Sequence, residues 1–327
     1  MRDAGSAADR AAAVFAPLAP IGATRSRAGA LAEPSHLAPL ALWPATQLLH
    51  AHVAAAAAGL GGRPESVAAR LVRYRRGAGW STQPLVGRRY YDDVAWLGLA
   101  ALAARRSGRV GPWAQLAARA SAFTLRGERP GGGVAWRVGG RAVHACSTGA
   151  AGLLAAGLGG PAQVAFARRC LAALDGPLRL PGGLVADHRH PDGRREETMW
   201  SYNQGLAIAL TLAVGAGTPA QRVAAAAARA AAVVEALPLD VVWLQPPAFV
   251  AIFGRALVAL GDADGDPAWG RYLDAYRHRV WSTARVGRWC TGGGIGAYDD
   301  GRVLDQSGLS QLFTLATLAP HAAAQVC

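Results

Sequence analysis

The 327-residue chain is 52% apolar and 17% charged, with a formal net charge of +13, so it can build a large core and is not generally disordered. All its basic residues are arginines, scattered singly or in pairs, so no dense basic run indicates nucleic-acid binding. Cys146, Cys170, Cys290 and Cys327 have no CxxC spacing, so we expect no metal site, no disulfide framework and no cofactor.

The N-terminal segment lacks the features of a signal peptide. Asp3 and Asp9 precede a weak apolar run that prolines interrupt, which favours a cytoplasmic location. No charge-free apolar run reaches the length that a transmembrane helix needs, so no membrane span is expected. We expect a monomer.

Helical periodicity dominates the chain, and strand signals are scarce. Glycine and proline clusters, such as 61–62 and 159–161, separate the helical segments. The sequence predicts twelve helices over 6–16, 42–59, 63–76, 90–106, 110–124, 143–158, 161–174, 201–216, 218–236, 246–261, 266–284 and 303–319.

The connections between these helices alternate in length. Short links, such as 107–109, follow the even-numbered helices, and long links precede them. This alternation predicts an all-α fold, an (α/α)6 barrel of six inner and six outer helices, forming a single domain over 1–327 with an irregular linker at 17–41. The alternative all-α layout, a helical-repeat solenoid, requires a fixed sequence period, and none is visible.

Each even-numbered helix begins with a polar or aromatic cluster. In a ring of parallel inner helices these starts converge on one cavity, where free helix N–H groups can bind carboxylates and substrate oxygens. The clusters are LWPATQ (42–47), YYDDVAW (90–96), HACST (144–148), WSYNQG (200–205), QPPAF (245–249) and LDQSGLSQ (304–311).

Amides, hydroxyls and aromatic rings around acids are typical of a sugar site. Taken singly, each aromatic residue could be a core residue and each hydroxyl a helix cap; their position at one end of alternating helices favours a shared site. Asn203 is the only asparagine in the chain. The candidate substrate-binding residues are Trp43, Gln47, Tyr91, Trp96, Gly132, Gly133, Trp136, His144, Ser147, Tyr202, Asn203, Gln204, Phe249 and Gln306.

Asp92 and Asp93 form the candidate catalytic pair. Glycosidic cleavage uses two carboxyl groups, and a short separation favours retention of configuration. Two neighbouring carboxylates repel, so one pKa should be raised towards neutrality. A second pair, Asp299 and Asp300, precedes Gly301 in a glycine-rich segment and is interpreted as part of a turn.

From about Leu42 to Leu318, these motifs together resemble glycoside hydrolase family 76, the α-1,6-mannanases. The resemblance rests on YYDDVAW, GGGVAW (131–136), HACST, WSYNQG and LDQ, in that order. It implies an (α/α)6 barrel that hydrolyses α-1,6-linked mannan with retention, with Asp92 as nucleophile and Asp93 as general acid/base. Val94 after the pair, Ala135 before Trp136 and the lack of asparagine near His144 depart from the family pattern.

Three other functions remain open at this point. One is another (α/α)6 sugar enzyme, such as a uronide hydrolase or an epimerase, whose anionic substrate would suit the positive charge. Another is a carbohydrate-binding protein with a decayed site, against which the intact Asp92, Asp93, Tyr202, Asn203 and Gln204 argue. The third is nucleic-acid binding, for which the charge is the only indication.

Overall fold

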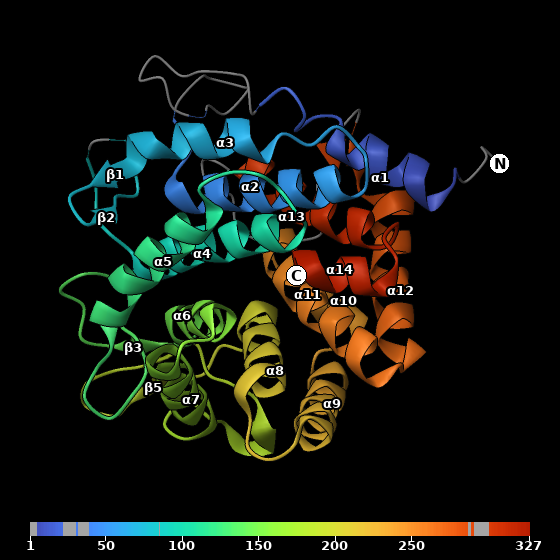
Figure 1. Ribbon diagram of the computed structural model, residues 1–327. Coiled ribbons are helices and arrows are strands. Elements are labelled where there is room, and N and C mark those ends of the chain that lie inside the picture. The colour runs from blue at the N-terminus through green and yellow to red at the C-terminus, as the bar shows by residue number, and fades with distance from the viewer. Residues whose placement is uncertain (1–4, 22–30, 32–38, 85, 287–288, 291–300) are drawn as a thin grey trace.

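Six parallel helices form a closed inner ring in the computed structural model, which describes residues 5–21, 31, 39–84, 86–286, 289–290 and 301–327. Each inner helix packs against the next around the ring, and the last packs against the first (Figure 1). In ring order they are α2 (Leu42–Ala57), α4 (Tyr91–Arg106), α6 (Ala145–Leu158), α8 (Ser201–Val214), α11 (Pro247–Asp264) and α13 (Gly301–Leu315).

An outer helix packs on each inner helix. Five of them follow their inner partner directly in the chain, whereas α1 packs on α13 from the opposite end of the sequence. The outer helices are α1 (Ala7–Phe15), α3 (Pro64–Leu71), α5 (Trp113–Thr124), α7 (Pro161–Asp175), α9 (Pro219–Ala236) and α12 (Pro267–Thr283). This arrangement confirms the predicted all-α (α/α)6 barrel.

Local sequence signals explain where several outer helices begin. Thr218 and Gln221 form a capping box around Pro219, so two free N–H groups at the start of α9 are satisfied. Asp266 caps α12 by accepting from the N–H of Ala268, and Pro267 takes the first helical position.

The structure differs from the predicted helices in three places. The helix expected over 63–76 ends at Leu71 and continues as a 3-10 turn, Val72–Tyr74, because the chain there turns into strand β1 (Arg75–Arg76). Two short helices were not predicted: α10 (Leu239–Trp243), inside a connection, and α14 (Pro320–Val326), which packs against α2, α4 and α11. Most of the linker predicted at 17–41 lies outside the described residues.

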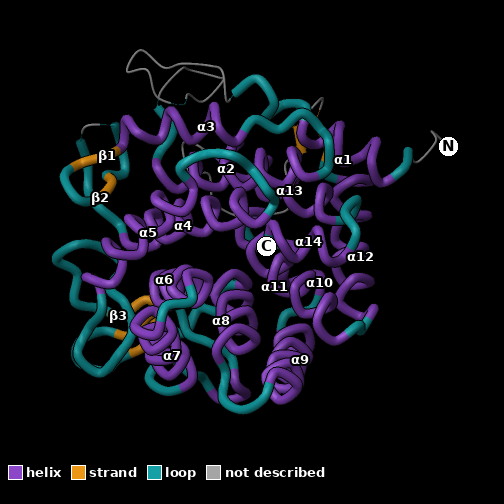
Figure 2. Tube along the Cα trace, viewed as in Figure 1, coloured by secondary structure: helices purple, strands orange, loops and turns teal. Residues whose placement is uncertain are grey.

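The long connections all lead into the N-terminal ends of the inner helices, which we call the mouth of the barrel. They carry the short antiparallel strands seen in orange in Figure 2. Besides β1, these are β2 (Gly79–Trp80), β3 (Val143–His144), β4 (His188–Arg189), β5 (Arg195–Glu196), β6 (Arg285–Val286) and β7 (Trp289–Cys290). Strands β3, β4 and β5 form one sheet beside the start of α6.

Two motif glycines allow the inner helices to approach closely. A Cβ on Gly205 would lie 2.6 Å from the Cα of Phe253, and one on Gly308 would lie 2.7 Å from the Cα of Ala248. Real Cβ atoms do not come so near to backbone, so both α8 and α13 need glycine where they meet α11.

The far end of the barrel, at the C-terminal ends of the inner helices, contains a cavity of about 260 Å³ next to α14. Apolar side chains make up most of its wall, joined by Arg106 and Arg255. Among the described residues, no helix combines the length and the apolarity that crossing a membrane requires.

Candidate active site

Asp92 and Asp93 lie in the first turn of α4, at the mouth of the barrel. The free N–H groups of this turn favour negative charge at the Asp92 and Asp93 carboxyl groups. Asp93 is 7% exposed, whereas Asp92 is half-buried. The Oδ1 atom of Asp92 is buried without a hydrogen-bond partner among the described residues, which leaves one acceptor for a ligand.

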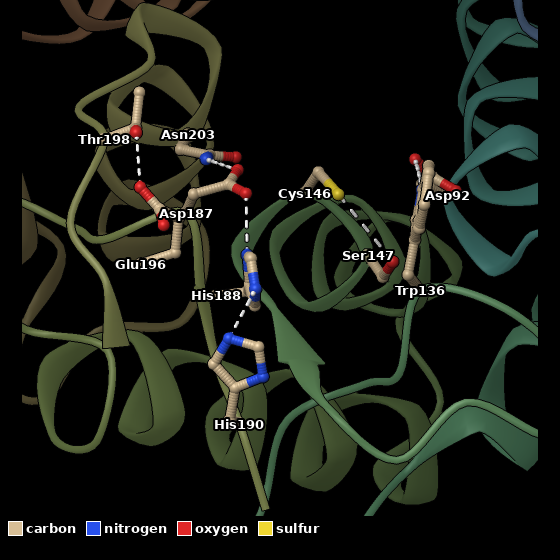
Figure 3. A network of polar contacts seen from close by, with 10 residues as sticks. All are labelled: Asp92, Trp136, Cys146, Ser147, Asp187, His188, His190, Glu196, Thr198 and Asn203. Atoms are coloured by element: carbon tan, nitrogen blue, oxygen red, sulfur yellow. Dashed lines mark hydrogen bonds and ion pairs between the residues drawn. The ribbon is translucent and has the colours of Figure 1, made fainter. Parts of the chain in front are cut away.

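Trp136 is the direct neighbour of the acid pair. Its indole Nε1 donates to Oδ2 of Asp92 at 3.0 Å, and its ring is 41% exposed (Figure 3). Tyr90 packs against this ring at 4.6 Å between centroids. An exposed indole fixed beside a carboxylate can support a sugar ring.

The loop before Trp136 depends on its glycines. Gly131, Gly132 and Gly133 have φ values of +84°, +88° and +81°, a left-handed conformation that suits glycine. A Cβ on Gly133 would also lie 2.4 Å from Cγ1 of Val143. The structure therefore gives Gly132 and Gly133 the role of turning the chain so that the backbone oxygen of Trp136 accepts from the N–H of Tyr91 at 2.8 Å.

The two carboxyl groups have different environments. Burial raises the pKa of Asp92 to about 6, against the opposing effect of the hydrogen bonds from Trp136 and the backbone N–H groups. Burial, together with the charge of Asp92, raises the pKa of Asp93 well above its usual value. Two carboxyl groups so close together and so buried do not readily carry two negative charges, so the pair is suited to hold one proton near neutral pH.

The opposite wall of the mouth carries Asn203 and Asp187. The Nδ2 atom of Asn203 donates to Oδ1 of Asp187 at 3.2 Å, and Oδ1 of Asn203 is buried without a hydrogen-bond partner among the described residues. A buried carbonyl oxygen without a donor is available to a ligand hydroxyl. Figure 3 shows both residues across from Asp92 and Trp136.

Aromatic side chains from three helix starts form one cluster at the mouth. Tyr202 stacks on Phe249 at 4.1 Å, and Trp43 and Trp200 contact the same phenyl ring at 5.7 and 5.3 Å. The structure thus brings the predicted residues Trp43, Tyr202 and Phe249 together.

His144 links this region to Trp136. Its ring stacks on Trp136 at 5.5 Å on one side and on His188 at 4.4 Å on the other. Burial, followed by the nearby His188 and His190, lowers the pKa of His144 to about 3. His144 is therefore neutral at physiological pH.

Several predicted residues are used inside the fold. Gln204 bonds through Oε1 and Nε2 to the backbone of Val185, at 2.9 and 2.8 Å. Gln306 accepts from the N–H of Cys290 and donates to the carbonyl of Val14. These side chains bond to loops and to α1, and they do not point into the mouth.

Four more predicted residues have buried side chains. Tyr91 packs on Phe123 of α5 at 5.2 Å, so Tyr90, and not Tyr91, flanks Trp136. Gln47 and Ser147 are fully buried, the former with Nε2 unpaired among the described residues. Trp96 is 2% exposed and lines the cavity at the far end.

The sequence analysis missed Tyr90, Asp187, His188 and His190. An Asp-His-x-His run inside a long connection was the available signal for the last three, because alternate residues of a strand share one face. Asp299 and Asp300, predicted to form a turn, lie outside the described residues.

Comparisons with known proteins find similarity in structure but none in sequence. No family model matches the sequence, and no curated protein matches it. A family 76 glycoside hydrolase (mannosidase) from Bacteroides thetaiotaomicron superposes with a TM-score of 0.81 at 17% identity, over 95% of this chain and 98% of that one.

Two further solved structures are similar. An inactive variant of an α-1,6-mannanase from Salegentibacter, with two consecutive aspartates replaced by asparagine and α-1,6-mannotriose bound, has a TM-score of 0.77 at 17% identity, over 95% of this chain and 99% of that one. Dfg5 from Chaetomium thermophilum, bound to glucosamine, has a TM-score of 0.73 at 14% identity, over 94% of this chain and 90% of that one. These likenesses establish a shared fold.

Proposed function

We propose that this chain is a retaining glycoside hydrolase of the family 76 type, acting on α-1,6-linked mannan or manno-oligosaccharides, with a single catalytic domain over 1–327. The observation that carries the proposal is the adjacent pair, Asp92 and Asp93, at the start of an inner helix, with Asp92 hydrogen-bonded to the exposed Trp136. The inactive Salegentibacter mannanase, in which two consecutive aspartates are replaced, adds support.

The chemistry follows from the two environments. The carboxylate of Asp92 attacks the anomeric carbon while the glycosidic bond breaks and Asp93 gives its proton to the leaving oxygen. Water then attacks the glycosyl–Asp92 ester, Asp93 takes a proton from that water, and Asp92 is released as a carboxylate. The indole N–H that bonds to Oδ2 of Asp92 lowers the pKa of this carboxyl and so favours its charged form as the nucleophile.

The substrate is held by the remaining groups of the mouth. Trp136 offers a ring face to a pyranose, and the unpaired Oδ1 of Asn203 accepts from a sugar hydroxyl. No arginine forms an ion pair or hydrogen bond with these groups in the described residues, so a neutral sugar fits better than a uronide.

The test is hydrolysis of α-1,6-mannotetraose, followed by NMR from the first minutes. We expect shorter manno-oligosaccharides whose new reducing end is first the α-anomer. α-1,2- and α-1,3-linked mannotetraoses and an unsaturated uronide disaccharide serve as parallel substrates. Cleavage of the uronide alone would indicate a uronide hydrolase in place of a mannanase. Binding of the tetraose without turnover would indicate a carbohydrate-binding protein with a decayed site.

A further inference from the structure

Two of the connections at the mouth are strongly basic. The segments 72–90 and 125–144, which lead into α4 and α6, together contain nine arginines and a single acidic residue, Glu128. By contrast, the segment 176–200, which leads into α8, contains four arginines and four acidic residues, so its charges balance. We call 72–90 and 125–144 the basic wall, and it lies beside the helix start that carries the acid pair.

The charge of the basic wall is not compensated within the described residues. None of its nine arginines forms an ion pair there, although arginines elsewhere in the molecule do. Glu128, the one acid of the wall, pairs with Arg169 of α7 at 2.6 Å. Arg129 and Arg76 donate to backbone carbonyl groups, at 2.6 and 3.5 Å, which leaves their charge in place. The wall therefore presents a positive potential to a ligand that approaches the acid pair.

Two arginines of the basic wall lie on the same side of the backbone as Tyr90. Backbone hydrogen bonds of 2.8 and 3.0 Å hold the segments 88–91 and 136–138 next to each other in antiparallel orientation. They place Tyr90 directly opposite Arg137, in the type of pair whose side chains approach most closely. Alternate residues of an extended segment point to the same side, so Arg88 lies on this side as well.

These two arginines border the ring that can support a sugar. The ring of Tyr90 packs on Trp136 at 4.6 Å between centroids. The indole of Trp136 in turn donates to Asp92 (Figure 3). Arg88 and Arg137 are exposed, so their guanidinium groups are available to a ligand. A sugar that lies on Trp136 therefore brings its substituents close to two cations.

The acid pair explains why these charges lie beside the reacting centre and not in it. A guanidinium group in contact with Asp92 or Asp93 would lower the pKa of that carboxyl and remove the proton that glycosidic cleavage needs. Among the described residues, no arginine forms an ion pair with either aspartate. The cleaved bond therefore suits neutral sugars, and an anionic group of the substrate must lie further along its chain.

The linkage restricts which anion this group can be. In an α-1,6-linked chain, carbon 6 of each internal sugar carries the bridging oxygen, so it cannot be the carboxylate of a uronic acid. A phosphate ester on another hydroxyl group is compatible with the linkage. At pH 7 a phosphate monoester carries about −1.5 to −2 charges and three acceptor oxygens, which match the charge and the donors of two guanidinium groups.

We propose that the substrate of this site is an α-1,6-mannan that carries a phosphate monoester, which Arg88 and Arg137 bind while neutral sugars occupy the acid pair. The identity of the sugar rests on the proposed function, whereas the phosphate site rests on the register of the two arginines and on the charge of the basic wall. The other seven arginines of the wall attract the anionic chain from a distance.

The experiment compares kcat/KM for α-1,6-mannotetraose with kcat/KM for two phosphorylated tetraoses, one with phosphate at O6 of the non-reducing end and one with phosphate at O1 of the reducing end. At low salt, at least one of them should be cleaved about tenfold more efficiently than the neutral tetraose, and sodium chloride should reduce this advantage. Arg88→Gln and Arg137→Gln should each lower the advantage about threefold or more. Arg105→Gln, exposed in the last turn of α4 at the far end of the barrel, is the matched control and should keep it.

Binding to the double variant Asp92→Asn/Asp93→Asn separates this inference from the proposed function. Calorimetry should show that a phosphorylated tetraose binds about tenfold more tightly than the neutral one, and Arg88→Gln in the same background should reduce this preference. If no tetraose is cleaved but the preference remains, the glycosidase proposal fails and the phosphate site stands. Equal kcat/KM and equal affinity for neutral and phosphorylated tetraoses would overturn the phosphate site alone. Binding to phosphatidylcholine/phosphatidylglycerol vesicles that Arg88→Gln abolishes, with no preference among the tetraoses, would overturn it in favour of an anionic membrane surface.

Discussion

A tryptophan lies beside a charged side chain both at the mouth of the barrel and in its interior, but the two charged side chains differ in exposure and in hydrogen-bond partners. At the mouth, Trp136 is 41% exposed, and Asp92 keeps an oxygen without a partner among the described residues. In the interior, Trp96 is 2% exposed, and the guanidinium of Arg255 lies over its ring at 5.3 Å. Arg255 also donates to Nδ1 of His50 at 2.7 Å.

The interior cluster is closed on itself. Nε2 of His50 lies 3.2 Å from the carbonyl oxygen of Trp96, so both ring nitrogens have partners. Burial, followed by the charge of Arg255, lowers the pKa of His50 well below its usual value, and burial lowers the pKa of Arg255 to about 10. The difference teaches that paired polar groups hold this barrel together, whereas unpaired ones at its mouth are available to a substrate.

The largest effect is expected for the acid pair. Asp92→Asn and Asp93→Asn should each lower kcat on α-1,6-mannotetraose about a thousandfold or more, because nucleophile and proton donor are lost. Thermal unfolding at pH 8 should occur at the wild-type temperature or above, because a buried carboxyl is replaced by a neutral amide. A variant that retains turnover, or one that no longer folds, would contradict the assignment of this pair to chemistry.

Arg255→Ala should lower the stability of the protein and leave its activity unchanged, the opposite of the result expected for the acid pair. It leaves Nδ1 of His50 without its donor and exposes the face of Trp96 to a void, at a cost of about 2–4 kcal/mol in the free energy of unfolding. The kcat/KM of the folded protein should stay at the wild-type value. Arg255→Met restores most of the volume and should lose less stability; a large loss of activity with unchanged stability would reverse the comparison.

Two glycine substitutions test the close contacts of the interior. Gly205→Ala places a Cβ against the backbone of Phe253 and should destabilise the protein by about 1–3 kcal/mol. Gly270→Ala, in α12, meets no atom within 4 Å and should stabilise it by about 0.5–1 kcal/mol. Urea unfolding measures the change in the free energy of unfolding for both variants. If Gly205→Ala also stabilised the protein, α8 and α11 would be able to move apart without cost.

The mouth should also be visible in the pH dependence of stability. Both aspartates have a pKa raised by burial, so the folded protein binds more protons than the unfolded chain above about pH 4. The contribution of the pair is therefore most favourable at low pH and falls as pH rises through the folded pKa of Asp92, about 6. Between pH 5 and 8, wild type should lose more stability than Asp92→Asn/Asp93→Asn in urea unfolding, by up to about 1.4 kcal/mol per pH unit for each extra proton that the folded pair holds; parallel curves would refute this.

Among the variants of the mouth, the smallest effect is expected for Trp136→Phe, which keeps an aromatic face and removes the indole N–H. Since that hydrogen bond lowers the pKa of Asp92, the acidic limb of kcat/KM should move to higher pH. The kcat/KM at the optimum should fall about tenfold, and the unfolding free energy should change by less than about 0.5 kcal/mol because the side chain is exposed. An unmoved acidic limb would mean that the indole acts only as a platform.

Sequence alone could predict the ring of helices and the place of the acid pair. The alternation of short and long connections is a chain-wide pattern, and it correctly predicts six inner helices with their starts at one end. The positions of Asp92, Trp136 and Asn203 at that end follow from it.

The direction of individual side chains could not be predicted in the same way. Tyr90 and Tyr91 are neighbours of identical chemistry, but one flanks Trp136 and the other packs on Phe123. Gln306 lies in the second turn of its inner helix and Asn203 in the first turn of another, but Gln306 is turned towards α1 and β7. One residue along a helix changes the direction by about 100°, so a small error in the helix start exchanges a substrate contact for a structural one.

The packing of α1 on α13 joins the first described helix of the chain to its last inner helix. During synthesis, α1 and the side of α2 that faces α13 stay without this contact until α13 has been made, near the end of the chain. Contacts between such distant segments form slowly, because a long loop must close before they contribute. We therefore expect this seam, where Gln306 bonds to the carbonyl of Val14, to be the last part of the barrel to fold and the place where chaperones or aggregation compete with closure.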